Sequence, residues 1–324
     1  MVDREQFQKS ELSPGIWNPS SVEESHEGEA HVKRRRRLSL IVLATAAAIT
    51  SAASCASANG SHPSVSGSHV LASGRQAPEG GPAHAPTPTI VLVHGAWADA
   101  SSWAEVTERL QKRGFTVLAP PDTLRGVATD TANLRAFLQT LTGPVVLAGH
   151  SYGGFVITNA ATGLSNIKAL VYVDAYIPDT GDTVGQLTAA QPGSVLAVSD
   201  PSTVFNSVPI PGSNGDADLF VKPNLFPGFF AAGVPLNKSA VLAAGQRPFA
   251  ASILTQPSGQ PAWKTIPSWA LIGTADRVLP PAEQRVMTAR AGSHTVSVNA
   301  PHLSMISNPD AVTDVVISAV QGSE

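Results

Sequence analysis

One serine stands in a pattern that suits nucleophilic catalysis. Residues 149–153 read Gly-His-Ser-Tyr-Gly, a G-x-S-x-G match that occurs once in the chain. The apolar run 145–148 ends directly before it, and a helical pattern over 154–162 begins directly after it. Side chains beside the serine would collide in so tight a turn, which explains the glycines. The pattern predicts that Ser151 is a nucleophile at a strand–turn–helix junction.

A serine hydroxyl needs a base within hydrogen-bond reach, and the base needs an acid that orients it. In this arrangement the chain order is serine, acid, histidine. Asp276 follows the apolar run 268–273, so it should lie on a loop at the carboxyl end of a strand, where α/β sheets build their sites. Asp174, directly after the run 167–173, is an alternative acid. We favour Asp276 because its loop leads directly to the helix and strand that precede a suitable histidine.

That histidine is His302, which follows the β-type run 294–298 and precedes the last helical pattern. A loop in this place is where the base is expected. His294 begins the same run, so it should lie at the opposite edge of the sheet. His94 and His150 precede the acid, and we interpret both as structural.

Acyl chemistry also needs donors for a developing oxyanion. One should be the backbone N–H of Tyr152, which follows the nucleophile, and the second should come from the loop after the first strand. That loop, 94–97, reads His-Gly-Ala-Trp, and the N–H of Ala96 is the expected second donor. Trp97 either lines the substrate pocket or only packs.

Strand and helix patterns alternate around these residues. The alternation predicts an α/β fold, with a mostly parallel sheet and helices on both faces. Strands are expected over 89–93, 115–119, 145–148, 167–173, 268–273 and 294–298. Helices are expected over 102–113, 130–141, 154–162 and 281–291, and a last helix capped at 308–310 should reach Val320.

The alternation lapses over about 178–264, a segment rich in Pro, Gly and Phe with short helical patterns. We expect this insert to form a cap over Ser151. Phe226 and Phe229 in it predict an apolar wall of the substrate pocket. The alternative is that both only bury the cap against the sheet. The folded domain should thus cover 89–324.

Residues 1–58 have the composition of an export signal. Five basic residues at 33–37 precede an uncharged Ala-rich run, 38–53, and Ala-Ser-Ala at 56–58 fits a cleavage site. The protein should therefore be exported, by the general or the twin-arginine route, to the outside or the periplasm. A lipid anchor on Cys55, the one cysteine of the chain, is a weaker alternative, as is a basic tail beside an Ala-rich helix.

Residues 59–88 are rich in Ser, Gly and Pro, and predict a disordered linker. The chain of 324 residues has a formal net charge of -3, which gives no reason to expect a nucleic-acid or stable membrane partner. No His, Cys and Asp cluster has metal-ligand spacing and no glycine-rich loop has a phosphate-binding pattern, so no metal or other cofactor is expected.

Five segments resemble the α/β-hydrolase superfamily, in order, over about 89–320: VLVHGAW with SSW, GHSYGG, YVDAYIP, GTADRVLPP and PHLSM. They are most similar to the small serine esterases related to plant methylesterases and hydroxynitrile lyases. The resemblance implies a triad of Ser151, Asp276 and His302, with oxyanion donors at Ala96 and Tyr152. The lyases of this group carry lysine directly after the histidine, whereas Leu303 stands here, which favours esterase chemistry.

The expected activity is hydrolysis of a small carboxylic ester through an acyl-enzyme. Two alternatives remain open. The fold also supports C–C hydrolases, amidases, perhydrolases and lyases, and some proteins with it only bind small molecules. Low charge near the motifs favours a neutral, fairly apolar ester.

Overall fold

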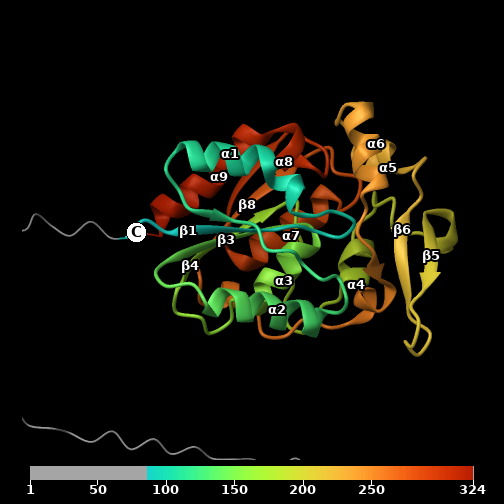
Figure 1. Cartoon of the computed structure of the whole chain (residues 1–324), viewed down its shortest axis with the longest axis horizontal. Coiled ribbons are helices and arrows are strands. Elements are labelled where there is room, and N and C mark those ends of the chain that lie inside the picture. The colour runs from blue at the N-terminus through green and yellow to red at the C-terminus, as the bar shows by residue number, and fades with distance from the viewer. Residues whose placement is uncertain (1–85, 324) are drawn as a thin grey trace, which may run out of the picture. The chain divides into compact units, whose positions relative to one another are not determined.

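Six parallel strands form one sheet in the computed structural model, which describes residues 86–323. The strands are β1 (Thr89–Val93), β2 (Val117–Leu118), β3 (Val145–His150), β4 (Ile167–Val173), β8 (Ser268–Gly273) and β9 (His294–Val298). Their spatial order is β2-β1-β3-β4-β8-β9 (Figure 1). The parallel α/β sheet predicted from the alternating patterns is thereby confirmed. The export signal and nearly all of the linker predicted for 1–88 lie outside the described residues.

Burial explains why the central strands read as continuous apolar runs. Every residue of β3 and β8 is buried, as expected where helices cover both faces of a parallel sheet. The edge strands differ: β2 is half-buried and shorter than the predicted 115–119, and four of the five residues of β9 are exposed.

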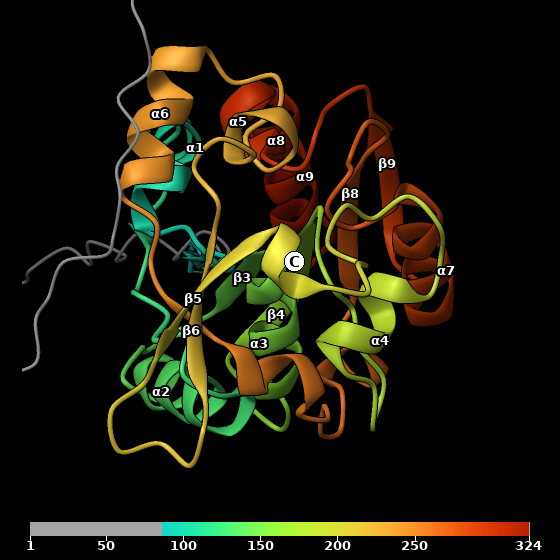
Figure 2. The ribbon, with the colours of Figure 1, turned by 90° about the vertical axis from the view of Figure 1, so that its right-hand side faces the viewer.

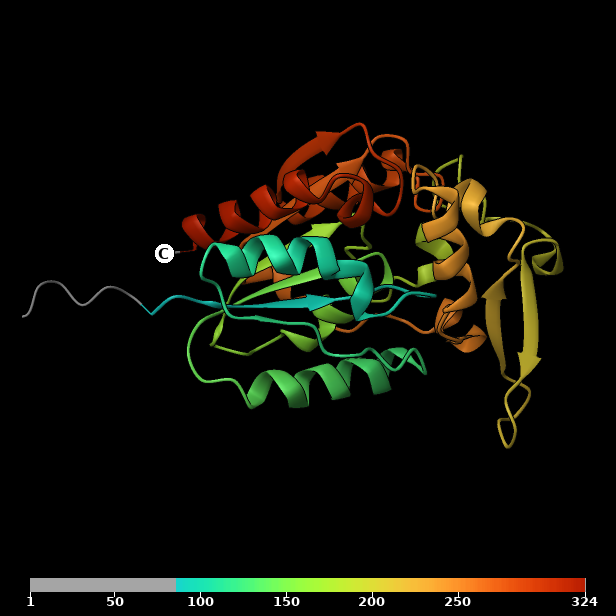
Figure 3. The same cartoon turned by 45° about the horizontal axis from the view of Figure 1, so that its top comes forward.

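Helices cover the two faces of the sheet. α1 (Ala104–Lys112) and α9 (Pro309–Gly322) pack together on one face, and α2 (Val127–Gln139) and α3 (Tyr152–Ala160) pack together on the other (Figures 1 and 3). α7 (Pro281–Ala291) packs against β8, and the short α8 (Ser304–Ser307) leads into α9. The loops from β3, β8 and β9 into α3, α7 and α8 therefore carry the three residues of the expected triad.

Between β4 and β8 the chain leaves the sheet and forms the segment called the cap below. Its elements are α4 (Val184–Ala189), β5 (Phe205–Pro209), β6 (Ala217–Val221), α5 (Phe226–Phe229), α6 (Leu236–Ala244), β7 (Phe249–Ala250) and short 3-10 turns. The strands make an antiparallel sheet in the order β5-β6-β7, which the sequence did not predict. Figure 2 looks onto the cap, with β5 and β6 in front of the ends of β3 and β4.

Side chains from the body hold the cap in place at β6. The Trp97 indole N–H donates to the Leu219 carbonyl at 2.8 Å, and the Arg125 guanidinium pairs with the Asp218 carboxylate at 2.6 Å. The cap is thus fixed over the carboxyl ends of the strands, where the candidate site residues lie.

Candidate active site

Ser151 occupies a strained turn between β3 and α3. Its φ of 52° and ψ of -122° are rarely adopted by a residue with a side chain. The neighbouring glycines are required by space: a Cβ on Gly149 would lie 2.6 Å from the Gly153 carbonyl carbon, and one on Gly153 would lie 2.5 Å from the Val93 carbonyl oxygen. The tight strand–turn–helix junction predicted around Ser151 is therefore present.

Asp276 and His302 are brought together by the loops after β8 and β9. Asp276 Oδ2 lies 2.8 Å from His302 Nδ1, and both side chains are fully buried. The other Asp276 oxygen accepts the N–H groups of Val278 and Leu279 at 2.7 and 3.0 Å, and Oδ2 also accepts from Gln284 at 2.8 Å. These contacts fix the carboxyl group and, through it, the imidazole ring.

Burial sets the electrostatics of this pair. Removal from water raises the pKa of Asp276, and the hydrogen bonds from Val278, Leu279 and Gln284 oppose that shift. Since those three neighbours offer only N–H donors, the arrangement satisfies a carboxylate. Burial lowers the pKa of His302 below its ordinary value, so the imidazole is neutral near pH 7. A neutral ring that donates Nδ1–H to Asp276 leaves Nε2 free to accept a proton, and Nε2 has no hydrogen-bond partner among the described residues.

Asp174, the alternative acid, contacts backbone rather than the histidine. One carboxyl oxygen accepts the Gly273 N–H at 2.7 Å and the other the Ser304 N–H at 3.2 Å. These amides stand at the roots of the loops that carry Asp276 and His302. Asp174 therefore connects the two loops, which is a positioning role.

His150 and His94 form hydrogen bonds with backbone groups close to the candidate site. His150 Nε2 lies 2.9 Å from the His302 carbonyl oxygen, and His94 Nε2 accepts the Asp122 N–H at 3.0 Å. Burial lowers the pKa of both imidazoles, and His302 adds to the effect at His150. Both rings are thus neutral and bonded to backbone, which agrees with the structural role expected for them.

A cavity of about 340 Å³ opens at Ser151. Ala96 and Tyr152, the expected oxyanion donors, line it, and neither backbone N–H donates to another described residue. The rest of the lining is mostly apolar: Trp97, Tyr176, Val184, Gly185, Thr188, Ala189, Leu196, Ala197, Val198, Phe205, Phe249, Leu254 and Val278. The Tyr176 hydroxyl is 2.7 Å from that of Thr188, which in turn donates to the Val184 carbonyl. The lining therefore suits an uncharged, largely apolar ligand.

The three expected pocket residues lie in different places. Trp97 lines the Ser151 cavity, Phe226 lines a neighbouring cavity, and Phe229 is buried but lines neither. The sequence did not identify Phe205 and Phe249, the aromatic residues of the cap that do line the Ser151 cavity. Both belong to strands of the cap sheet that the sequence did not predict, so the sequence could not show which way their side chains point.

His294 lies at the start of β9, away from the site as expected. Its ring stacks on Trp269, with the ring centroids 5.0 Å apart.

Within residues 86–323 no group of three or more His, Cys, Asp or Glu side chains is placed to hold a metal ion. Over the same residues, no helix is both long and apolar enough to cross a membrane.

Comparison with known proteins identifies the family of the chain. The model of the "Alpha/beta hydrolase family" matches residues 90–315. A "Carbendazim hydrolyzing esterase" from a Nocardioides species is 36% identical over 121 residues, which are 33% of this chain and half of that protein's length.

Two solved structures have the same fold. An extracellular alpha/beta-hydrolase from a Paenibacillus species, described as structurally and functionally homologous to tobacco salicylic acid binding protein 2, is 23% identical. It superposes with a TM-score of 0.58 over 72% of this chain and 98% of its own. Polyneuridine aldehyde esterase is 19% identical, with a TM-score of 0.61 over 72% of this chain and 98% of its own.

Proposed function

Because the chain belongs to the alpha/beta hydrolase family, we propose that it hydrolyses carboxylic esters through an acyl-enzyme on Ser151. His302 is the general base, Asp276 orients it, and the backbone N–H groups of Ala96 and Tyr152 bind the oxyanion. The observation that carries the proposal is the buried 2.8 Å contact between Asp276 and His302, in loops beside the strained serine turn.

Each residue has one role in the reaction. His302 Nε2 takes the hydroxyl proton as Ser151 Oγ attacks the ester carbonyl, and the imidazolium that forms is stabilised by the Asp276 carboxylate. The two amides stabilise the negative oxygen of the tetrahedral intermediate. His302 then protonates the leaving alcohol, and water, deprotonated by His302, releases the acid from Ser151 by the same route. The Ser151–His302 hydrogen bond forms as substrate enters, because such bonds often tighten only in the complex.

The substrate class follows from the lining of the Ser151 cavity. It carries no charged side chain, and its polar side chains other than Ser151 are Tyr152, Tyr176 and Thr188. The Tyr152 hydroxyl donates a hydrogen bond to Asp130, and the hydroxyls of Tyr176 and Thr188 bond to each other. A charged substrate group would lose its hydration there without compensation. We therefore infer a small neutral ester. The name of the similar Nocardioides protein supports ester hydrolysis in general.

Export remains part of the proposal. The extracellular relative from Paenibacillus supports it, and the composition of residues 1–58 motivates it. Expression of the full chain in a bacterium, followed by N-terminal sequencing of protein outside the cytoplasm, should find a start near Asn59. Full-length protein confined to the cytoplasm would contradict the export signal.

The activity is tested with p-nitrophenyl acetate, butyrate and octanoate and three proteins. Wild type and Ser268→Ala should hydrolyse at least one ester, and Ser151→Ala should lose at least about a thousandfold in kcat. Ser268 is a matched control because it is a buried serine at the start of β8, bonded to Ser293. A fluorophosphonate probe should modify wild type and Ser268→Ala on Ser151, as read by mass spectrometry of the peptide.

Turnover that survives in folded Ser151→Ala would reject the nucleophile. Labelling without ester turnover would move the assignment to another bond type, and neither labelling nor turnover in folded wild type would favour a binding protein.

A further inference from the structure

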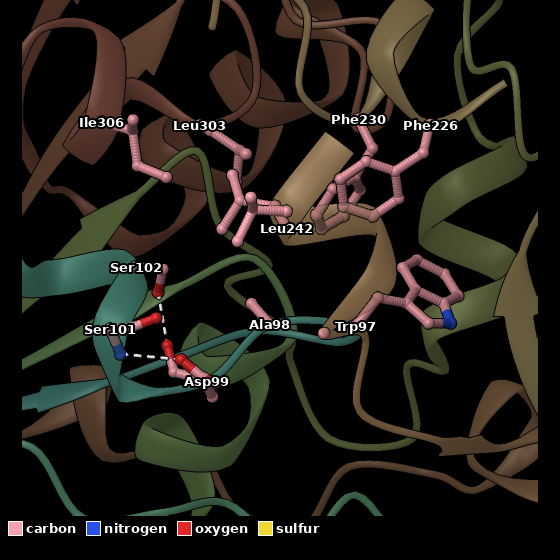
Figure 4. A pocket seen from close by; sticks show the side chains of 12 residues that line it. Trp97, Ala98, Asp99, Ser101, Ser102, Phe226, Phe230, Leu242, Leu303 and Ile306 are labelled. Carbon is pink, nitrogen blue, oxygen red and sulfur yellow. Dashed lines mark hydrogen bonds between the residues drawn. The ribbon is translucent and has the colours of Figure 1, made fainter. Parts of the chain in front are cut away.

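A second cavity, of about 140 Å³, lies beside the cavity at Ser151. Figure 4 shows it, with Trp97 at one edge, Phe226 and Phe230 beside the indole, and Leu303 and Ile306 on the far side. Its remaining lining residues are Ala98, Asp99, Ser101, Ser102, Val241, Leu242 and Gly245. Trp97 is the one residue that lines both cavities.

The Trp97 indole contacts aromatic side chains that line each of the two cavities. Phe230, which lines only the second cavity, meets it edge-on at a centroid distance of 5.7 Å. Phe205 and Phe249, which line only the Ser151 cavity, each contact it at 5.4 Å. The ring is therefore held between residues of the two cavities.

Two further features hold the indole in this position. Its N–H donates to the Leu219 carbonyl at 2.8 Å, and the Trp97 backbone is held in the left-handed region, with a φ of 57°. The residue is only 5% exposed. Rotation of the ring would break a buried hydrogen bond and three aromatic contacts, which disfavours rotation in the resting protein.

The second cavity suits an uncharged apolar group. Its polar side chains lie in one loop, where Asp99 accepts the Ser101 N–H at 2.8 Å and the Ser102 hydroxyl donates to the Asp99 carbonyl at 2.7 Å. The other lining side chains are hydrocarbon or aromatic. An alkyl or aryl group gains by burial there, whereas an anionic chain end would lose its hydration and be repelled by the Asp99 carboxylate.

We propose that Trp97 is a specificity-determining partition, which limits the apolar part of the ester to the Ser151 cavity and closes off a second, ready-made apolar subsite. The inference rests on the proposed esterase function. Removal of the indole joins the two cavities and shifts the preference toward esters with longer acyl or alkyl chains.

The test compares kcat/KM for two series, p-nitrophenyl esters from acetate to dodecanoate and alkyl acetates from ethyl to octyl. Trp97→Ala should raise the ratio of long-chain to short-chain kcat/KM at least tenfold in one series. Tenfold corresponds to about 1.4 kcal/mol of transition-state stabilisation, less than the burial of two methylene groups supplies. Taking a ratio removes any loss caused by the neighbouring donor Ala96, which lowers all esters alike.

Two further variants make the result specific. Trp269→Ala truncates a buried tryptophan on β8, away from both cavities, and should leave the ratio at the wild-type value. Leu242→Trp, added to Trp97→Ala, places an indole back into the second cavity only, and should return the ratio toward wild type.

The outcomes separate the two proposals. If folded wild type hydrolyses no ester, the proposed function fails first. If wild type is active but folded Trp97→Ala keeps the wild-type ratio in both series, the partition is wrong. It is also wrong if Leu242→Trp leaves the raised ratio unchanged. If Trp97→Ala does not fold, Trp97→Leu tests the same point with more of the packing kept.

Discussion

Two buried aspartates, Asp276 and Asp174, follow neighbouring strands, and replacing each by asparagine separates their roles. At Asp276 the oxygen near Val278 and Leu279 accepts two backbone N–H groups, so an asparagine would place its carbonyl there. Its NH₂ would then face His302 Nδ1, and Nδ1 would have to accept. The ring proton would move to Nε2, the nitrogen that we propose takes the proton of Ser151.

A tautomer reversed in this way should lower kcat on p-nitrophenyl acetate by about 10³–10⁴-fold. Asp174→Asn should behave differently because its partners are two backbone N–H groups, from Gly273 and Ser304. An asparagine carbonyl can satisfy only one of them and leaves the other buried without an acceptor. The expected cost is about 1–3 kcal/mol in the free energy of unfolding, with kcat within about tenfold of wild type.

The assays are kcat at saturating ester and urea unfolding of both variants and wild type. The reasoning fails if Asp276→Asn keeps kcat within tenfold of wild type. It fails equally if Asp174→Asn loses 10³-fold in kcat while its free energy of unfolding is unchanged, because Asp174 would then be the orienting acid.

Three other predictions follow from buried groups around the site. Tyr152→Phe removes the hydroxyl that donates to Asp130 at 2.8 Å but keeps the backbone N–H, so stability in urea should fall by about 1–2 kcal/mol while kcat stays within a fewfold. Burial raises the pKa of Asp122 to about 8, and the nearby charge of Asp130 adds to the shift. The unfolded value is near 4, so between pH 4 and pH 8 the folded state binds a proton that the unfolded state has lost. The free energy of unfolding therefore falls as the pH rises through this range. Asp122→Asn should therefore have a higher Tm than wild type at pH 8 and a vanishing difference near pH 4; an equal gain at both would refute the assignment. Burial lowers the pKa of His302, so the acid limb of kcat/KM against pH should lie below the ordinary imidazole value of about 6.5, and an acid limb at or above pH 6.5 would contradict this.

The sequence predicted those parts of the site that depend on local geometry. Ser151 was identified because a tight turn between a buried strand and a helix needs glycines, and the close approaches at Gly149 and Gly153 confirm that requirement. The positions of Asp276 and His302 could be predicted because carboxyl ends of parallel strands share one edge of the sheet.

The cap could not be predicted in the same way, because its strands are short and do not alternate regularly with helices in the sequence. Leu219 and Phe249 pair across β6 and β7, yet nothing in the local sequence shows which face of this small sheet meets Ser151. The lining depends instead on long-range contacts such as the bond from Trp97 to Leu219. Phe205 and Phe249 were therefore missed, while Phe226 and Phe229, which were predicted to line the pocket, do not line the Ser151 cavity.

Backbone strain marks the same edge of the sheet independently of any motif. Four residues other than glycine have positive φ in the part of the chain that the structure describes, and three of them, Trp97, Ser151 and Asp174, follow the adjacent strands β1, β3 and β4. Each such conformation costs on the order of 1–3 kcal/mol, and persists only where the surroundings impose it. These three turns carry Trp97, the proposed partition, Ser151, the proposed nucleophile, and Asp174, which connects two loops by hydrogen bonds. The cost is concentrated at the site, which is where strain is expected if geometry, rather than stability, constrains these positions.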